Sequence, residues 1–131
     1  MARRPQETPT EVELEVLKVL WDRGPSTVRE VLTVLNAKRK RAYTSVMSVL
    51  NIMTEKQQVT RKPDGRAFIY TVKRPRENTL GKMIGSLLGR AFEGSASLLV
   101  SQVLDQSKPS AEELDKIRKA IEEYEGRSTN Q

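Results

Sequence analysis

A run of small polar side chains between residues 44 and 51 has the clearest chemistry in this sequence. Hydroxyl and amide groups donate and accept hydrogen bonds, so they suit the edges of DNA bases, and an Asn can pair with adenine. A Met in the same run could touch the methyl group of thymine. The candidate base-contacting residues are Thr44, Ser45, Met47, Ser48 and Asn51. The alternative for this run is an ordinary solvated helix face.

Basic side chains lie on both sides of the polar run. Lys38-Arg39-Lys40-Arg41 precedes it, and like charges this close repel one another unless a polyanion neutralises them. The candidate phosphate-contacting residues are Lys38, Arg39, Lys40, Arg41, Tyr43, Arg61, Lys62 and Arg66. A polar face between two basic clusters predicts contact with double-stranded DNA.

The net charge is unevenly distributed along the chain. The 131 residues carry a formal net charge of +6. Residues 1–75 hold 15 Lys and Arg against 8 Asp and Glu, whereas residues 76–131 hold 8 against 9. The excess of positive charge therefore lies in the first half, which indicates that this half meets the polyanion.

The composition excludes several kinds of site. The chain has no His and no Cys, so it lacks disulfides, thiolate or imidazole metal ligands and the commonest catalytic side chains. We expect no metal, no cofactor and no enzymatic activity, since the paired carboxylates at Glu112-Glu113 and Glu122-Glu123 fit a solvated helix face. No apolar run is long enough to span a membrane and no signal-peptide core follows the N-terminus. A cytoplasmic protein without membrane insertion is expected.

Helix signals position the polar run. Thr10-x-x-Glu13 is a capping box that predicts a helix to about residue 22, and Thr27-x-x-Glu30 predicts a second helix. Apolar residues at helical spacing predict a third helix over about 42–57, with the polar run on its opposite face.

A hairpin signal follows the third helix. The β-prone runs 59–62 and 67–72 flank Asp64-Gly65, which is a strong turn signal. Three short helices followed by a basic hairpin describe a winged helix-turn-helix, whose third helix enters the major groove. The predicted fold class is mainly α with a small β-hairpin wing.

The second half is expected to be helical and to form a homodimer. Its helices are predicted at about 76–93, from 95 or 97 to 106, and 110–125, and the first carries an apolar stripe too wide for an exposed helix. The alternative is a monomer in which these helices pack on the first half. The candidate dimerisation residues are Leu80, Met83, Ile84, Leu87, Leu88, Phe92, Leu99, Val103, Leu114, Ile117 and Ile121. The predicted organisation is a flexible basic arm at 1–9, a winged-helix DNA-binding domain at 10–75, a helical dimerisation domain at 76–125 and a disordered tail at 126–131.

Four segments together resemble a known family. They are PTEVELEVLKVLW at 9–21, STVREV at 26–31, YTSVMSVL at 43–50 and GRAFIY at 65–70. The chain is identified by them as similar to the BlaI/MecI/CopY-type penicillinase repressors, over about residues 8–124. This resemblance implies a dimeric winged-helix repressor that binds a dyad operator, often with TACA/TGTA-type half-sites, and blocks transcription of resistance or stress genes.

The resemblance also implies how repression ends. In the β-lactam branch of the family, a membrane sensor with a metalloprotease domain triggers cleavage in the C-terminal region. The candidate cleavage position is Ser101-Gln102, where the family's Asn-Phe pair would align, and neither residue matches. In the copper branch, Cys pairs bind metal, and this chain has no Cys. Proteolysis and loosening of the dimer by antibiotic or stress therefore both stay open.

Two other functions compete with a specific repressor. A winged helix can dock an acidic protein partner through its basic face, which would leave little DNA binding at physiological salt. A non-specific DNA-architectural protein would bind all sequences with equal affinity.

Overall fold

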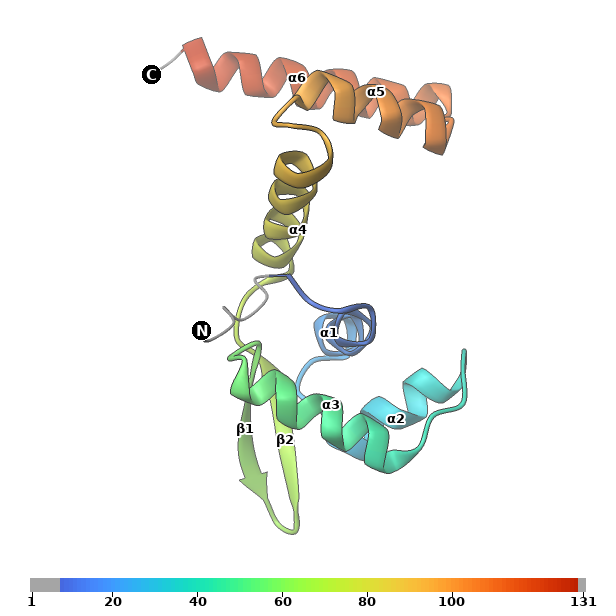
Figure 1. Ribbon diagram of the computed structural model, residues 1–131, viewed down its shortest axis with the longest axis vertical. Helices are drawn as coiled ribbons and strands as arrows, with labels where there is room; N and C mark the ends of the chain where they lie inside the picture. The colour runs from blue at the N-terminus through green and yellow to red at the C-terminus, as the bar shows by residue number, and fades with distance from the viewer. Residues whose placement is uncertain (1–7, 130–131) are drawn as a thin grey trace. The chain divides into compact units, whose positions relative to one another are not determined.

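The computed structural model describes residues 8–129, so the predicted arm at 1–9, with Arg3 and Arg4, lies almost wholly outside the described residues. Three helices come first, then a two-stranded hairpin, then three more helices (Figure 1). Their bounds are α1 Glu11–Arg23, α2 Val28–Asn36, α3 Tyr43–Glu55, β1 Val59–Asp64, β2 Ala67–Val72, α4 Arg76–Ala91, α5 Ala96–Ser107 and α6 Ala111–Thr129. The predicted mainly α fold with one hairpin is confirmed.

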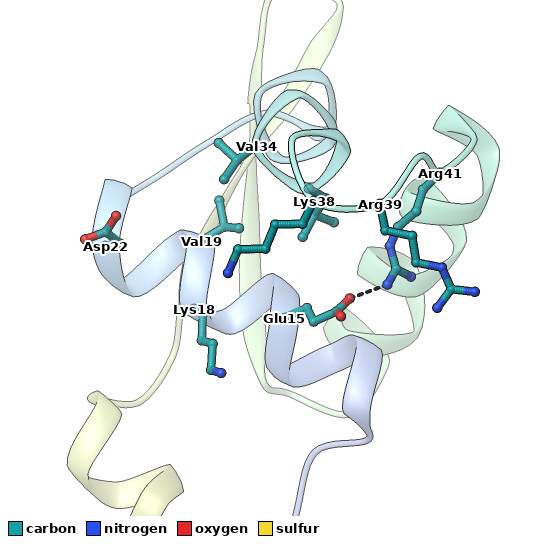
Figure 2. Close-up of a pocket in the computed structure, with 9 residues that line it drawn as sticks. Glu15, Lys18, Val19, Asp22, Val34, Lys38, Arg39 and Arg41 are labelled. Atoms are coloured by element: carbon teal, nitrogen blue, oxygen red, sulfur yellow. Dashed lines mark hydrogen bonds and ion pairs between the residues drawn. The ribbon is translucent and has the colours of Figure 1, made fainter.

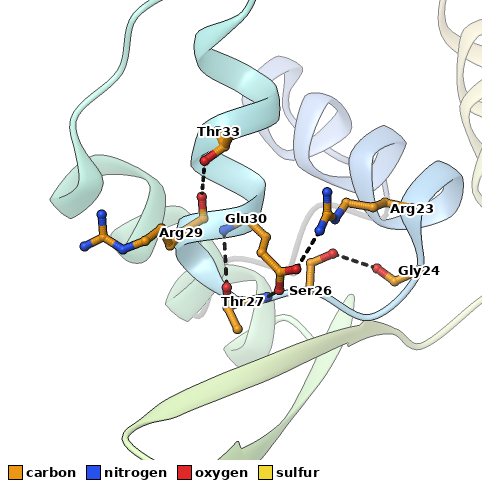
Figure 3. Close-up of polar contacts among 7 residues, drawn as sticks. All are labelled: Arg23, Gly24, Ser26, Thr27, Arg29, Glu30 and Thr33. Atoms are coloured by element: carbon orange, nitrogen blue, oxygen red, sulfur yellow. Dashed lines mark hydrogen bonds and ion pairs between the residues drawn. The ribbon is translucent and has the colours of Figure 1, made fainter.

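Both predicted capping boxes are present. Thr10 Oγ1 accepts from the Glu13 backbone N–H at 3.2 Å, and the Thr10 N–H donates to the Glu13 carboxylate at 3.0 Å. Thr27 and Glu30 make the same pair of bonds at 3.2 and 2.9 Å. Glu30 also pairs with Arg23 in the last turn of α1, so this one carboxylate joins the end of α1 to the start of α2 (Figure 3). These local bonds set where the first two helices begin.

The buried core lies among α1, α2, α3 and the hairpin. Val16, Val31 and Leu50 are each 0% exposed, and Tyr70 of β2 is 1% exposed. The full core comprises Val16, Leu17, Val19, Leu20, Val28, Val31, Leu35, Val46, Leu50, Met53, Val59 and Tyr70. Every member precedes residue 71, so the first half builds its own core.

The hairpin is attached to this core at its base. Val59 pairs with Val72 and Asp64 pairs with Ala67, so β1 is two residues longer than the predicted run of 59–62. Gly65 takes a φ of +63° in the turn, a conformation that glycine adopts without steric cost. Ser26, between α1 and α2, exchanges backbone hydrogen bonds of 3.1 and 2.8 Å with Tyr70. This bridge fixes the hairpin to the helices.

The chain divides into two compact units, one ending at Ser86 and one beginning at Leu87, so this division lies within α4. The domain boundary at residues 75–76 stays a prediction. The disordered tail predicted from Gly126 is wrong for 126–129, because α6 continues to Thr129. Arg127 stacks on Tyr124 one turn earlier, at 5.6 Å from the ring centre, and its charge favours a helix C-terminus. Residues 130–131 lie outside the described residues.

Candidate nucleic-acid interface

A hollow lies between the start of α2, the exposed face of α3 and the hairpin. Tyr43, Met47 and Asn51 reach it from α3, and Arg61 and Arg66 reach it from the hairpin. Its lining consists of Thr27, Val28, Arg29, Tyr43, Met47, Asn51, Arg61, Arg66, Ala67, Phe68 and Tyr70. Predicted base and phosphate contacts from separate parts of the sequence therefore share one surface, which we call the α3–hairpin hollow.

One hydrogen bond joins the helix to the hairpin across this hollow. Arg61 Nη1 donates to Asn51 Oδ1 at 3.1 Å. The Arg61 guanidinium also lies over the Phe68 ring, 4.5 Å from its centre. A guanidinium over an aromatic face is attracted by the ring quadrupole, so Phe68 helps to hold Arg61 beside Asn51.

Arg29 and Phe68 also line the α3–hairpin hollow, and neither was predicted from the sequence. Arg29, in the first turn of α2, lies 5.3 Å from the centre of the Tyr43 ring and adds a further cation to the hollow. Phe68 is 39% exposed, and its ring lies under the Arg61 guanidinium in the lining of this hollow. Two sequence signals could have indicated these residues. Phe68 is an aromatic residue in a basic hairpin, and Arg29 lies opposite the apolar stripe of its helix.

Three of the four cations in the basic run before α3 line a different hollow. Arg41 turns its guanidinium toward α1 and pairs with Glu15, and its backbone N–H donates to Asn36 Oδ1 at 2.8 Å. Figure 2 shows Arg41, Arg39 and Lys38 around a second hollow, which α1 and α2 line. Its lining consists of Glu15, Lys18, Val19, Asp22, Val34, Leu35, Lys38, Arg39 and Arg41. These three cations are therefore not brought into the α3–hairpin hollow.

The other predicted contacts are spread around α3 and the hairpin. Thr44 and Ser48 are exposed on α3. Ser45 lines a narrow gap with Val12 and Arg41, on the side of α3 that meets α1. Lys40 is exposed before α3, and Lys62 is exposed on the hairpin face opposite Arg61, because successive strand residues alternate.

A buried carboxylate joins α1 to the segment between α3 and the hairpin. Glu13 is 3% exposed and accepts hydrogen bonds from Lys56 Nζ at 2.8 Å and from Gln58 Nε2 at 3.2 Å. Burial alone would raise the pKa of Glu13, but the hydrogen bonds from Lys56, the Thr10 backbone and Gln58 lower it below the ordinary value. These bonds tie α1 to the end of α3 and to the residue before β1, so they hold the two elements that line the α3–hairpin hollow.

The sequence of the chain matches a known protein family. The family model described as Penicillinase repressor matches residues 9–123. The chain belongs to the penicillinase repressor family. The predicted resemblance is thereby confirmed, and it spans both compact units of the chain.

Two curated relatives and one solved structure illustrate the relationship. Transcriptional regulator BlaI of Mycobacterium tuberculosis is 34% identical over 116 residues, which are 88% of this chain and 83% of that protein. The penicillinase repressor of Bacillus licheniformis is 25% identical over 118 residues, 90% of this chain and 92% of that protein. The solution structure of the DNA-binding domain of the repressor BlaI is 26% identical with a TM-score of 0.50, and covers 60% of this chain and 93% of that domain.

This member of the penicillinase repressor family carries no acidic cluster that resembles a metal site within residues 8–129. In the same range, no helix is long and apolar enough to cross a membrane.

Proposed function

We propose that this chain is a sequence-specific DNA-binding repressor of transcription. The observation that carries the proposal is the α3–hairpin hollow, where base-contacting side chain types on α3 meet Arg29, Arg61 and Arg66. The relatives named as a transcriptional regulator and a penicillinase repressor support it. So does the likeness to a repressor's DNA-binding domain.

The proposed complex places α3 in the major groove. Helix-turn-helix proteins insert their second motif helix there, and its N-terminal residues contact base edges. Thr44, Met47 and Ser48 lie in the first two turns of α3 and are exposed. Arg66 at the hairpin turn then lies where it meets the neighbouring phosphates, which position the protein but carry no sequence information.

The proposed repressor acts as a homodimer through its C-terminal helices. No side chain from residue 76 to 128 is buried, although these helices carry many apolar residues. Ile84 and Ile121 are each 52% exposed. The predicted dimerisation residues that stand exposed are Leu80, Ile84, Leu87, Val103 and Ile121. A second copy of the chain would cover them, and a two-fold dimer matches a dyad operator.

Release of the operator would follow from weakening this dimer. Each half binds one half-site, and joining the halves raises affinity through effective concentration. Ser101 and Gln102 are exposed within α5, so this helix would have to unwind locally before a protease could cut there. Cutting or loosening α5 in response to an antibiotic or stress signal from a membrane sensor is the proposed mode of relief.

A binding titration tests the proposed function. Fluorescence anisotropy would compare the DNA upstream of the chain's own coding region with a scrambled duplex of equal length, at low and near-physiological salt. A specific repressor keeps its preference for the upstream DNA at the higher salt. Equal binding of both duplexes would indicate an architectural protein, and loss of all binding at physiological salt would indicate a protein partner.

A further inference from the structure

The bond between Asn51 and Arg61 restricts what Asn51 can offer to a base. Arg61 Nη1 lies 3.1 Å from Asn51 Oδ1. A guanidinium has five N–H donors and no acceptor, so the amide must turn its oxygen, not its nitrogen, toward Arg61. The Asn51 nitrogen keeps two donor hydrogens for another partner.

Arg61 is held in this position from two sides. Its guanidinium lies over Phe68, and its backbone is paired with Tyr70, which is 1% exposed and bonded to Ser26. The anchored strand and the aromatic face keep Arg61 beside α3. Such an Arg is less available to follow the DNA backbone than the exposed cations near the hairpin turn.

We propose that Asn51 and Arg61 recognise one base pair together and that the recognised base is guanine. This inference rests on the proposed function. An Asn that pairs with adenine uses its oxygen to accept from N6 and its nitrogen to donate to N7. Here the Asn51 oxygen already uses one of its two lone pairs on a cation, so it is a poorer acceptor for N6, and every other polar hydrogen that Asn51 and Arg61 offer is a donor. Guanine presents two acceptors, N7 and O6, in the major groove, whereas adenine presents one acceptor and one donor.

The inference revises two expectations from the sequence. Residue type alone favours adenine as the partner of Asn51 and phosphate as the partner of Arg61. Arg66 is the matched comparison, because it is the same residue type, lies on the same hairpin and lines the same hollow. In the proposal, Arg66 contacts phosphate and Arg61 contacts the base.

Selection from a pool of random duplexes tests the proposal and does not require the operator sequence. The full chain would be compared with Asn51→Ala, Arg61→Ala and Arg66→Ala. The unchanged chain is expected to select a guanine at one position. Asn51→Ala and Arg61→Ala are expected to lose about 5- to 150-fold discrimination at that same position. The double variant Asn51→Ala/Arg61→Ala should lose no more than either single variant.

Two further readouts separate this role from a general loss of charge. Asn51→Asp keeps a partner for Arg61 but has no donor, so its preference should move from guanine toward cytosine, whose N4 group donates. Arg66→Ala should weaken all sequences alike and lower the slope of log affinity against log salt by about 1.8, because the proposed dimer loses two phosphate contacts. Arg61→Ala should leave that slope unchanged. Thermal unfolding confirms that each variant is folded, as expected for exposed positions.

Two results would overturn the inference while the proposed function stands. One is an Arg61→Ala variant that behaves like Arg66→Ala, with uniform weakening and a lower salt slope. The other is an adenine at the position where Asn51→Ala loses discrimination. If the unchanged chain enriches no sequence from the pool, the proposed function fails together with the inference.

Discussion

Glu13 serves two purposes at the scale of a single residue. Its carboxylate caps α1 and, almost fully buried, accepts from Lys56 and Gln58. Lys56 is itself largely covered, with 25% of its side chain exposed. Removing one partner of a buried hydrogen bond leaves the other polar group without a partner. The free-energy cost of that unsatisfied group exceeds the net stabilisation that the bond provided.

Replacement of Glu13 by Gln should therefore destabilise the first unit. The Gln side chain has nearly the same shape but directs donor hydrogens at groups that also donate. We expect the free energy of unfolding to fall by about 1–3 kcal/mol, measured by urea denaturation. Glu11→Gln is the matched control, because Glu11 is exposed in the same turn, and it should change stability by less than about 0.5 kcal/mol. Equal effects of the two variants would contradict this role for Glu13.

The lowered pKa of Glu13 predicts a pH dependence of stability. A carboxyl with a lower pKa in the folded state than in the unfolded state stabilises the fold above its unfolded pKa. That stabilisation is lost as the pH falls through the folded pKa, below the ordinary Glu value of about 4.3. Unfolding midpoints measured from neutral to about pH 3 should fall less steeply for Glu13→Gln than for the unchanged chain. Parallel curves would show that Glu13 does not contribute.

At the scale of elements, the hairpin depends on its turn. Gly65 takes a φ of +63°, and an added Cβ would meet no atom within 4 Å, so the cost of a side chain there is conformational and not steric. Gly65→Ala should destabilise the turn by about 1–2 kcal/mol and weaken DNA binding, because Arg66 follows Gly65 directly in the turn. Thermal unfolding and DNA titration measure the two effects.

A second glycine provides the control for this prediction. Gly126 lies inside α6, where an added Cβ also meets no atom within 4 Å. Ala favours a helix interior over Gly by up to about 1 kcal/mol. Gly126→Ala should therefore leave stability unchanged or raise it, and it should not alter DNA binding. A loss of binding in both variants would argue against a specific role for the hairpin turn.

The elements were predictable where their signals are local. Thr10 and Thr27 each find their capping partner three residues later, so the sequence alone indicated both helix starts. The direction of Arg41 was not predictable, because a basic run has the same pattern whether its members meet phosphate or a carboxylate 26 residues earlier. The Asn51–Arg61 bond likewise depends on how the hairpin lies against α3, which no spacing in the sequence encodes.

At the scale of the whole molecule, the apolar surface of the C-terminal helices should govern the oligomeric state. Ile121→Asp places a charge on the exposed apolar face of α6 without touching the core of the first unit. We expect sedimentation to show a monomer, and affinity for a dyad site to fall by about 100-fold or more as the effective-concentration gain is lost. Lys116→Asp, an exposed charge change on the same helix, should preserve the dimer. A dimeric Ile121→Asp variant would contradict the assignment of this face.

The backbone bridge between Ser26 and Tyr70 anchors the hairpin at its base, and the turn end of the hairpin has no such anchor among the described residues. The base of the hairpin is part of the buried core. The amide protons of Ser26 and Tyr70 should therefore exchange with solvent only when the first unit unfolds as a whole. Beyond this anchor, residues 62–68 are exposed, so amide protons there should exchange through fraying of the tip. In the proposed DNA complex, the tip would therefore adjust to grooves of different width while the angle at which the hairpin leaves the core stays constant.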